Sequence, residues 1–170
     1  MATPDIDTLL HRGVFEIVVE KELRERLNEG KPLRLKMGFD PSRPDLHLGY
    51  AVALRKLRAF QELGHKVILI VGDWTARIGD PTGRSETRQM LTEEQVNANA
   101  ESYMRQFFKI VDRDRTEVVF QSEWFGKFGL ADVVRLTAKF TVAQFLERQD
   151  FANRYAQQRP IALVGFMYPI

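Results

Sequence analysis

The segment from Asp40 to Tyr50 contains side chains that could bind a nucleotide. It reads DPSRPDLHLGY and follows a short run of alternating apolar and polar residues, which is the pattern of a strand that ends in a loop. A helical pattern begins at His47, and a helix N-terminus offers free backbone N–H groups and a partial positive charge to phosphates. His47 could donate to a phosphate oxygen, and Gly49 could let a flat base approach the backbone. A loop that only caps an ordinary helix, with His47 on the surface, explains these residues equally well.

A second segment, from Gly72 to Arg84, reads GDWTARIGDPTGR and follows a continuous apolar run. It is too long and too varied in chemistry for a simple connection between two elements, and loops of this kind are often functional. Two consecutive turns without a ligand would also use the residues of its GDPTG part.

The elements around these segments predict an α/β fold. Residues 66–72 hold a continuous apolar run rich in β-branched residues, which favours a strand covered on both faces in a parallel sheet. Strand, helix and strand in succession form a βαβ unit with a right-handed crossover. The expected strands span residues 33–39, 66–72 and 117–120, and the expected helices span 5–27 with a break at Gly13, 47–63, 92–110, 131–139 and 142–147.

Composition places the chain among ordinary globular proteins and excludes several other classes. Of its 170 residues, 44% are hydrophobic and none is cysteine, which excludes disulfides and thiolate metal sites and suits a reducing, cytoplasmic compartment. The net charge of +2 argues against a surface covered with nucleic-acid contacts. We expect no signal peptide and no membrane span. The histidines are scattered, so no metal site built by the protein is expected.

The first segment, with the residues just before it, resembles a signature of the class I aminoacyl-tRNA synthetases. The order Gly-Phe-Asp-Pro-Ser followed by His-Leu-Gly-Tyr is similar to their His-Ile-Gly-His turn, and the preceding GFDP is typical of the tyrosyl branch. Tyr50 stands where the second histidine is usual; its hydroxyl can donate a hydrogen bond but cannot carry an imidazolium charge. The resemblance implies a motif from Pro41 to Tyr50 with His47 and Tyr50 as catalytic residues, and ATP-binding residues Asp40, Ser42, His47, Leu48, Gly49 and Tyr50.

The second segment resembles the tyrosyl branch more specifically, through its Thr and its Ile-Gly-Asp-Pro-Thr-Gly. The implied tyrosine-binding residues are Gly38, Thr75, Asp80 and Tyr168, with Asp80 and Tyr168 on the substrate ammonium. Lys36 and Met37 precede Gly38, which resembles a second bacterial branch rather than the enzymes with Tyr there. Three arginines near the second segment could meet pyrophosphate or the tRNA acceptor end, although solvated surface arginines are commoner: Arg77, Arg84 and Arg88. The aromatic residues Phe145, Phe151 and Tyr155 are more simply explained as core or subunit-contact residues.

The resemblance implies a Rossmann-like, doubly wound parallel sheet of the HUP type. We expect an N-terminal helical segment over residues 1–32 and the first half of the catalytic domain over 33–170, including part of a dimerisation region at about 113–154. The second half, with its Lys-Met-Ser-Lys-Ser-like loop, and the RNA-binding domains are not in the sequence.

The implied reaction activates tyrosine with ATP and then transfers the tyrosyl group to tRNA(Tyr). Mg²⁺ would arrive with ATP and keep its waters. The expected partners are ATP, tyrosine, tRNA(Tyr) and a second copy of the chain, and we expect weak activity or none from this chain alone. Two alternatives remain open: another nucleotidyltransferase with a related His-x-Gly-His turn, or a non-catalytic chain that only dimerises.

Overall fold

The computed structural model describes residues 5–78 and 91–169 of the chain. The chain divides into two compact units. Unit 1 comprises Met1–Phe39, Arg43–Val71 and Asn99–Val119, and unit 2 comprises Asp40–Ser42, Gly72–Ala98 and Phe120–Ile170.

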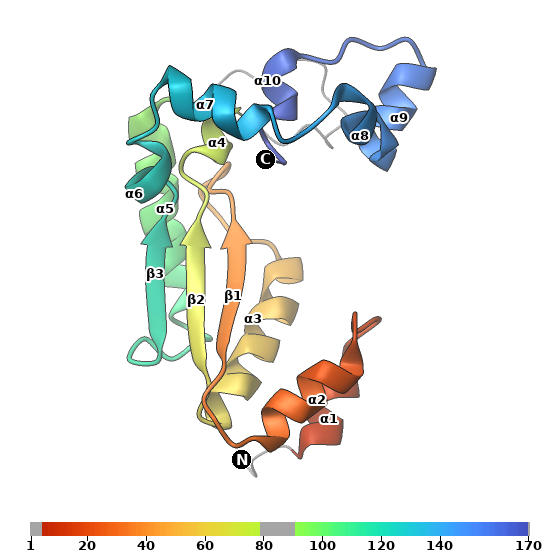
Figure 1. Cartoon of the computed structure of the whole chain (residues 1–170). Helices are drawn as coiled ribbons and strands as arrows, with labels where there is room; N and C mark the ends of the chain where they lie inside the picture. The colour runs from red at the N-terminus through yellow and green to blue at the C-terminus, as the bar shows by residue number, and fades with distance from the viewer. Residues whose placement is uncertain (1–4, 79–90, 170) are drawn as a thin grey trace. The chain divides into compact units, whose positions relative to one another are not determined.

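Unit 1 is built on a parallel sheet. Its strands are β1 (Arg34–Phe39), β2 (Lys66–Val71) and β3 (Thr116–Phe120, whose last residue belongs to unit 2), in the spatial order β1-β2-β3. β1 and β2 are parallel and pair from Arg34 with Lys66 to Phe39 with Val71, and the three arrows point the same way in Figure 1. The predicted α/β class and parallel sheet are therefore confirmed.

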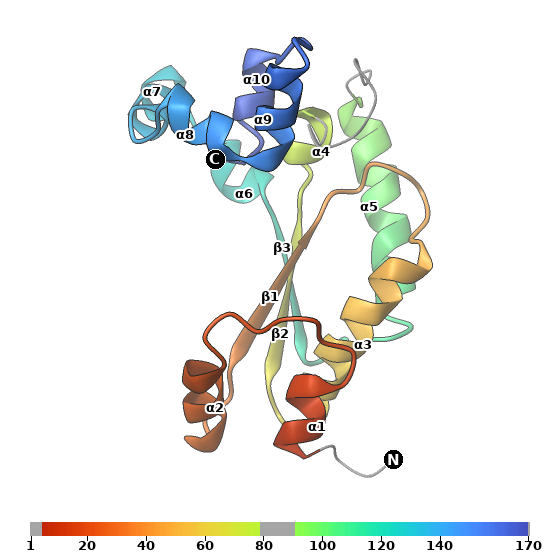
Figure 2. The ribbon, with the colours of Figure 1, turned by 90° about the vertical axis from the view of Figure 1, so that its right-hand side faces the viewer.

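One face of this sheet carries the core of unit 1. Phe39 and, on β2, Val67, Leu69 and Val71 are buried. The Phe39 ring meets the Phe107 ring edge-on, with centroids 4.3 Å apart. Phe107 ends α5 (Glu93–Phe107), and α3 (Leu48–Glu62) lies on the same face of the sheet (Figure 2). Because both crossover helices lie on one face, the three strands run outward in one direction only, as in one half of a doubly wound sheet.

The opposite face of the sheet is less covered. Lys36 and Gly38 of β1 are exposed there, and Ile68 and Ile70 of β2 are half-buried. The prediction that both faces of residues 66–72 are covered is therefore wrong for the described part of unit 1. The continuous apolar run reflects one buried face and one half-buried face.

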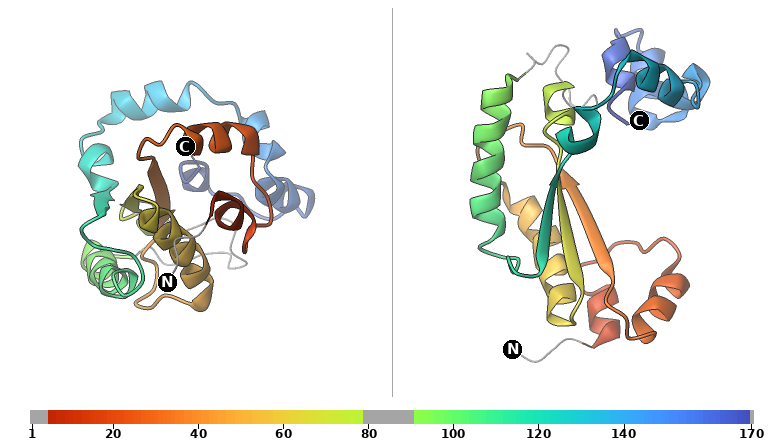
Figure 3. Two further views of the ribbon diagram at one scale, coloured as in Figure 1. Left: turned by 90° about the horizontal axis from the view of Figure 1, so that it is seen from below. Right: turned by 60° about the vertical axis from the view of Figure 1, so that its left-hand side comes forward.

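Two short helices pack against α3 before the sheet begins. They are α1 (Ile6–His11) and α2 (Glu20–Asn28) (Figure 3). Their apolar residues join Phe60 of α3 in a buried cluster. Lys56 of α3 fastens the end of α1, because its ammonium donates to the Leu9 and Arg12 carbonyl oxygens at 2.5 and 2.7 Å. The predicted helical segment is thus two helices with a long connection after Gly13.

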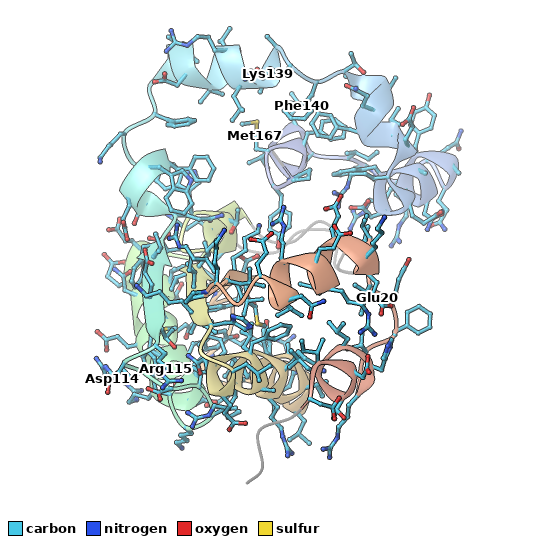
Figure 4. The ribbon with its side chains drawn as sticks, turned by 60° about the horizontal axis from the view of Figure 1, so that its bottom comes forward. Glu20, Asp114, Arg115, Lys139, Phe140 and Met167 are labelled. Atoms are coloured by element: carbon cyan, nitrogen blue, oxygen red, sulfur yellow. The ribbon has the colours of Figure 1, made fainter. Side chains whose placement is uncertain are left out.

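A buried amide fixes the turn that leads into β3, where Figure 4 labels Asp114 and Arg115. The side chain of Gln61 is 1% exposed. Its amide nitrogen lies 3.1 Å from the carbonyl oxygens of Asp112 and Arg115 and 2.9 Å from Thr116 Oγ1. The Asp112 N–H donates to the side-chain oxygen of Gln61, and the Arg115 guanidinium donates to the backbone carbonyl oxygen of Gln61. Since a buried polar group is costly unless hydrogen-bonded, this network holds α3 and the start of β3 in one arrangement.

Unit 2 is helical in its described part. Besides the first part of α5, up to Ala98, its elements are α4 (Thr75–Ile78), α6 (Ser122–Phe125), α7 (Leu130–Thr137), α8 (Val142–Glu147), α9 (Gln149–Ala156) and α10 (Leu163–Phe166). The Phe166 ring lies 4.9 Å, centroid to centroid, from the rings of both Phe145 and Phe151. This supports the interpretation of Phe145 and Phe151 as core residues, whereas Tyr155 is 67% exposed.

Candidate functional site

The residues that follow the three strands supply one hydrogen-bonded cluster within unit 2. Asp40 follows β1, Gly72 and Thr75 follow β2, and Gln121 follows β3. In open α/β sheets, ligands bind beyond the carboxyl ends of the strands. The polar side chains of Asp40, Thr75 and Gln121 therefore follow the strand ends, where a ligand site is expected.

Asp40 is the centre of this cluster. The Thr75 hydroxyl lies 2.6 Å from its Oδ1, and the Tyr168 hydroxyl donates to its Oδ2 at 2.5 Å. From the sequence, Asp40 is expected to bind ATP, and Thr75 and Tyr168 are expected to bind tyrosine. The structure joins all three, although Tyr168 lies 128 residues beyond Asp40 in the chain.

Gln121 is a member of the cluster that the sequence analysis did not single out. Its amide oxygen accepts from the Thr75 N–H at 3.1 Å and lies 2.9 Å from the Thr75 hydroxyl. Beside it, the Ser122 N–H donates to the Asp73 carboxylate at 3.0 Å. The available signal was its position directly after the third strand.

Gly72 makes the approach of Asp40 to Thr75 possible. A Cβ atom on Gly72 would lie 2.0 Å from Asp40 Oδ1 and 2.6 Å from Thr75 Oγ1. Both distances are far inside van der Waals contact, so any side chain at this position would displace the carboxylate or the hydroxyl.

The His47 turn belongs to unit 1. His47 is the N-cap residue of α3, and its ring Nδ1 accepts from the Gly49 N–H at 3.2 Å. The Tyr50 ring lies 4.7 Å from the His47 ring, centroid to centroid, with an angle of 44° between the planes. The helix start predicted at His47 is thus confirmed to within one residue.

The other predicted site residues differ in their surroundings. The Ser42 N–H donates to the Asp40 carbonyl oxygen at 2.8 Å, Leu48 is exposed, and Gly38 is exposed on β1. Arg77 lies over the Trp74 ring, 5.5 Å from its centroid, and 3.8 Å from the Glu93 carboxylate. Three residues named in the sequence analysis lie outside the described residues: Asp80, Arg84 and Arg88.

The Asp40 cluster has the chemistry of a binding site. Each carboxylate oxygen has further acceptor capacity beyond the hydrogen bond it already accepts, so Asp40 can still receive an ammonium or a hydroxyl group. The hydrogen bonds from Thr75 and Tyr168 orient the Asp40 carboxylate. Among the residues that the structure describes, no group of three His, Cys, Asp or Glu side chains could hold a metal ion, and no helix is long and apolar enough to cross a membrane.

Comparison with curated proteins identifies relatives named tyrosine–tRNA ligase. The chain is 62% identical over 165 residues to a tyrosine–tRNA ligase of Dehalococcoides mccartyi, a match that covers 97% of this chain and 42% of the relative. It is 56% identical over 169 residues to the tyrosine–tRNA ligase of Nitratidesulfovibrio vulgaris, covering 98% of this chain and 42% of that protein. The chain therefore spans about two-fifths of the length of these curated relatives.

Solved structures support the fold. A tyrosyl-tRNA synthetase from Archaeoglobus fulgidus, complexed with L-tyrosine, superposes with a TM-score of 0.71 at 23% identity over 95% of this chain and 48% of that chain. A tryptophanyl-tRNA synthetase from Plasmodium falciparum gives a TM-score of 0.63 at 16% identity over 88% of this chain and 38% of that chain. At these identities the likeness concerns the fold alone. A family model described as "tRNA synthetases class I (W and Y)" matches residues 28–170, and the chain therefore belongs to this family.

Proposed function

We propose that this chain supplies the tyrosine- and ATP-binding residues of a tyrosine–tRNA ligase, which forms tyrosyl-adenylate and transfers the tyrosyl group to tRNA(Tyr). The observation that carries the proposal is the hydrogen-bonded cluster in which Asp40 joins Thr75 and Tyr168. Relatives named tyrosine–tRNA ligase, at 56–62% identity, support the choice of substrate.

The first step requires alignment more than proton transfer. The tyrosine carboxylate is already ionised at neutral pH, so it can attack the α-phosphate of ATP without a general base. The rate then depends on holding the two substrates in line and on stabilising charge at the phosphates.

We assign the two tasks to two groups of residues. His47 and Tyr50 act on the phosphates, and ATP arrives as its Mg²⁺ complex, with Mg²⁺ bound mainly by phosphate and water. We assign Asp40 to both substrates. The resemblance implies that it binds ATP, and its hydrogen bonds to Thr75 and Tyr168 support a second role in binding tyrosine. The remaining assignments are Ser42, Leu48 and Gly49 for ATP, and Gly38, Thr75, Asp80 and Tyr168 for tyrosine.

A chimera tests the proposal. This chain would replace the matching 165 residues of the Dehalococcoides mccartyi tyrosine–tRNA ligase, and ATP–pyrophosphate exchange would be measured with tyrosine, tryptophan or phenylalanine. We expect exchange that depends on tyrosine, and little or no exchange from this chain alone. A folded chimera that exchanges equally with all three amino acids, or with none, would refute the assignment.

The proposal includes a second copy of the chain and a cytoplasmic location. Several large apolar side chains are exposed in unit 2 within residues 113–154, the region that we propose forms the contact between subunits: Leu130, Val134, Phe140 and Val142. The absence of cysteine from the sequence suits a reducing cytoplasm.

A further inference from the structure

The His47 ring is held at its Nδ1 atom by the backbone of α3. His47 has extended backbone angles (φ −95°, ψ 164°), as an N-cap residue should, and its Nδ1 accepts from the Gly49 N–H at 3.2 Å. A ring nitrogen that accepts a hydrogen bond carries no proton, so the proton of the neutral ring must be on Nε2. The cap therefore selects one tautomer and leaves Nε2 as a donor on an exposed side chain.

The absence of a side chain at Gly49 is what lets the ring fold back over the helix end. A Cβ atom on Gly49 would lie 2.9 Å from both Nδ1 and Cε1 of His47. Such contacts are too close for a real Cβ, so alanine at this position would push the ring away from the N–H that it caps. Gly49 was expected from the sequence to make room for a flat base, whereas the contact in the structure is with the neighbouring histidine.

Tyr50 braces the same ring from a second direction. Its ring packs against His47 and also faces Tyr103 and Phe107, with centroid distances of 6.0 and 6.5 Å. Tyr103 and Phe107 are almost fully buried. The His47 ring is thus positioned by a backbone donor and by an aromatic residue that is anchored in the core of unit 1.

We propose that Gly49 is a positioning residue: its N–H and its missing Cβ hold His47 as the neutral Nε2–H tautomer, so that His47 acts as a hydrogen-bond donor to the phosphates of ATP. The donor role rests on the proposed function. The tautomer and the cap do not, and they can be measured on this chain without any substrate.

Nuclear magnetic resonance of the ¹⁵N-labelled chain tests the cap and the tautomer. At about pH 8 we expect His47 with an unprotonated Nδ1 and a protonated Nε2. Replacing His47 with alanine should speed hydrogen exchange of the Gly49 amide by about tenfold, the loss of one ordinary hydrogen bond. In Gly49→Ala the His47 ring signals should shift. In the control Gly129→Ala, where the nearest atom to the new Cβ is 3.8 Å away, they should not.

Two substitutions of His47 separate the cap from the donor. Asparagine is a good N-cap residue, so His47→Asn should keep the Gly49 amide protected but should not reach the phosphates. Glutamine is longer and should place an N–H group near the Nε2 position while losing the cap. In the chimera we expect His47→Gln to retain about tenfold more ATP–pyrophosphate exchange than His47→Asn.

The outcomes are distinct. An Nδ1–H tautomer in the unsubstituted chain, or a Gly49 amide that exchanges equally fast with and without His47, overturns the positioning role. An exchange rate of His47→Asn equal to or above that of His47→Gln overturns the donor role. If the tautomer and the amide protection are as expected but the chimera exchanges with no amino acid, the positioning role stands and the proposed function fails.

Discussion

At Gly72, space rather than backbone conformation requires glycine. A Cβ there would lie 2.0 Å from Asp40 Oδ1 and 2.6 Å from Thr75 Oγ1. The carboxylate and the hydroxyl occupy the volume that any side chain at Gly72 would take. The absence of a side chain there is therefore what the cluster requires.

Gly72→Ala should therefore lower the rate of tyrosine-dependent exchange, because the new methyl group displaces the Asp40 carboxylate or the Thr75 hydroxyl. A shift of about 1 Å in a positioned group can lower a reaction rate about 100-fold, and we expect a loss of this order in tyrosine-dependent exchange by the chimera. Gly129→Ala, whose new Cβ meets only an ordinary contact at 3.8 Å, should leave the rate unchanged. Equal rates for the two variants would show that Asp40 and Thr75 need not be this close.

Gln121 has a role in holding Thr75 that a stability measurement can detect. Its amide oxygen accepts from the Thr75 N–H, and Gln121→Leu would leave that half-buried donor without its acceptor. We expect the free energy of unfolding to fall by about 1 kcal/mol, measured by urea denaturation of the chain. The control Gln157→Leu changes an exposed glutamine and should have little effect; a loss as large as that of Gln121→Leu would contradict the role.

At the scale of the elements, local patterns were sufficient for the strands and long helices. The strand predicted over residues 33–39 is observed as Arg34–Phe39, and the helix predicted over 47–63 is observed as Leu48–Glu62. Alternation and helical spacing are local properties, so they mark such elements well. The resemblance supplied Thr75 and Tyr168 in the same way, from short motifs.

What the sequence did not reveal depends on contacts between distant segments. The purpose of Gly72 and the place of Gln121 follow only when the segments after three strands are brought together. The helix α2 begins after Val19, which has a left-handed backbone (φ 59°) unusual for a β-branched residue. A β-branched residue disfavours that conformation, so no local pattern could predict it.

His65 links the entry to β1 with the entry to β2 and makes that junction sensitive to pH. It is 7% exposed, and its Nδ1 accepts from the Leu33 N–H at 3.1 Å. Burial lowers the pKa of His65 below the ordinary 6.5, so the unfolded chain binds the proton more readily than the folded chain. The stabilisation is complete above about pH 6.5 and is lost progressively as the pH falls below that value.

Urea denaturation at a series of pH values checks this expectation. The free energy of unfolding should decrease between about pH 7 and pH 5. His65→Asn should weaken that dependence, because the asparagine oxygen can accept from the Leu33 N–H without titrating. His11→Asn changes an exposed histidine and should leave the dependence in place. If the pH dependence of the free energy of unfolding is unchanged in His65→Asn, it arises from groups other than His65.

At the scale of the whole molecule, the exposed apolar residues of unit 2 call for a covering surface. Leu130 and Val134 are 80% and 58% exposed and lie four residues apart on α7, so they share one face of that helix. Scattered exposed apolar residues are normal, but a grouped set is typical of a protein interface. We expect the chain to self-associate through this face.

Sedimentation at increasing concentration would test the association. The unsubstituted chain should form a dimer, and the double variant Leu130→Glu/Val134→Glu should raise the dissociation constant by about 30-fold or more, because burying a carboxylate in the contact opposes the apolar gain. Phe15→Glu, which changes a fully exposed aromatic residue of unit 1, serves as the control and should leave the dimer intact. A chain that stays monomeric at high concentration, or a double variant that dimerises as well as its parent, would remove α7 from the subunit contact. In the first case the apolar face would need a different covering partner, and in the second the contact would have to involve other residues of the chain.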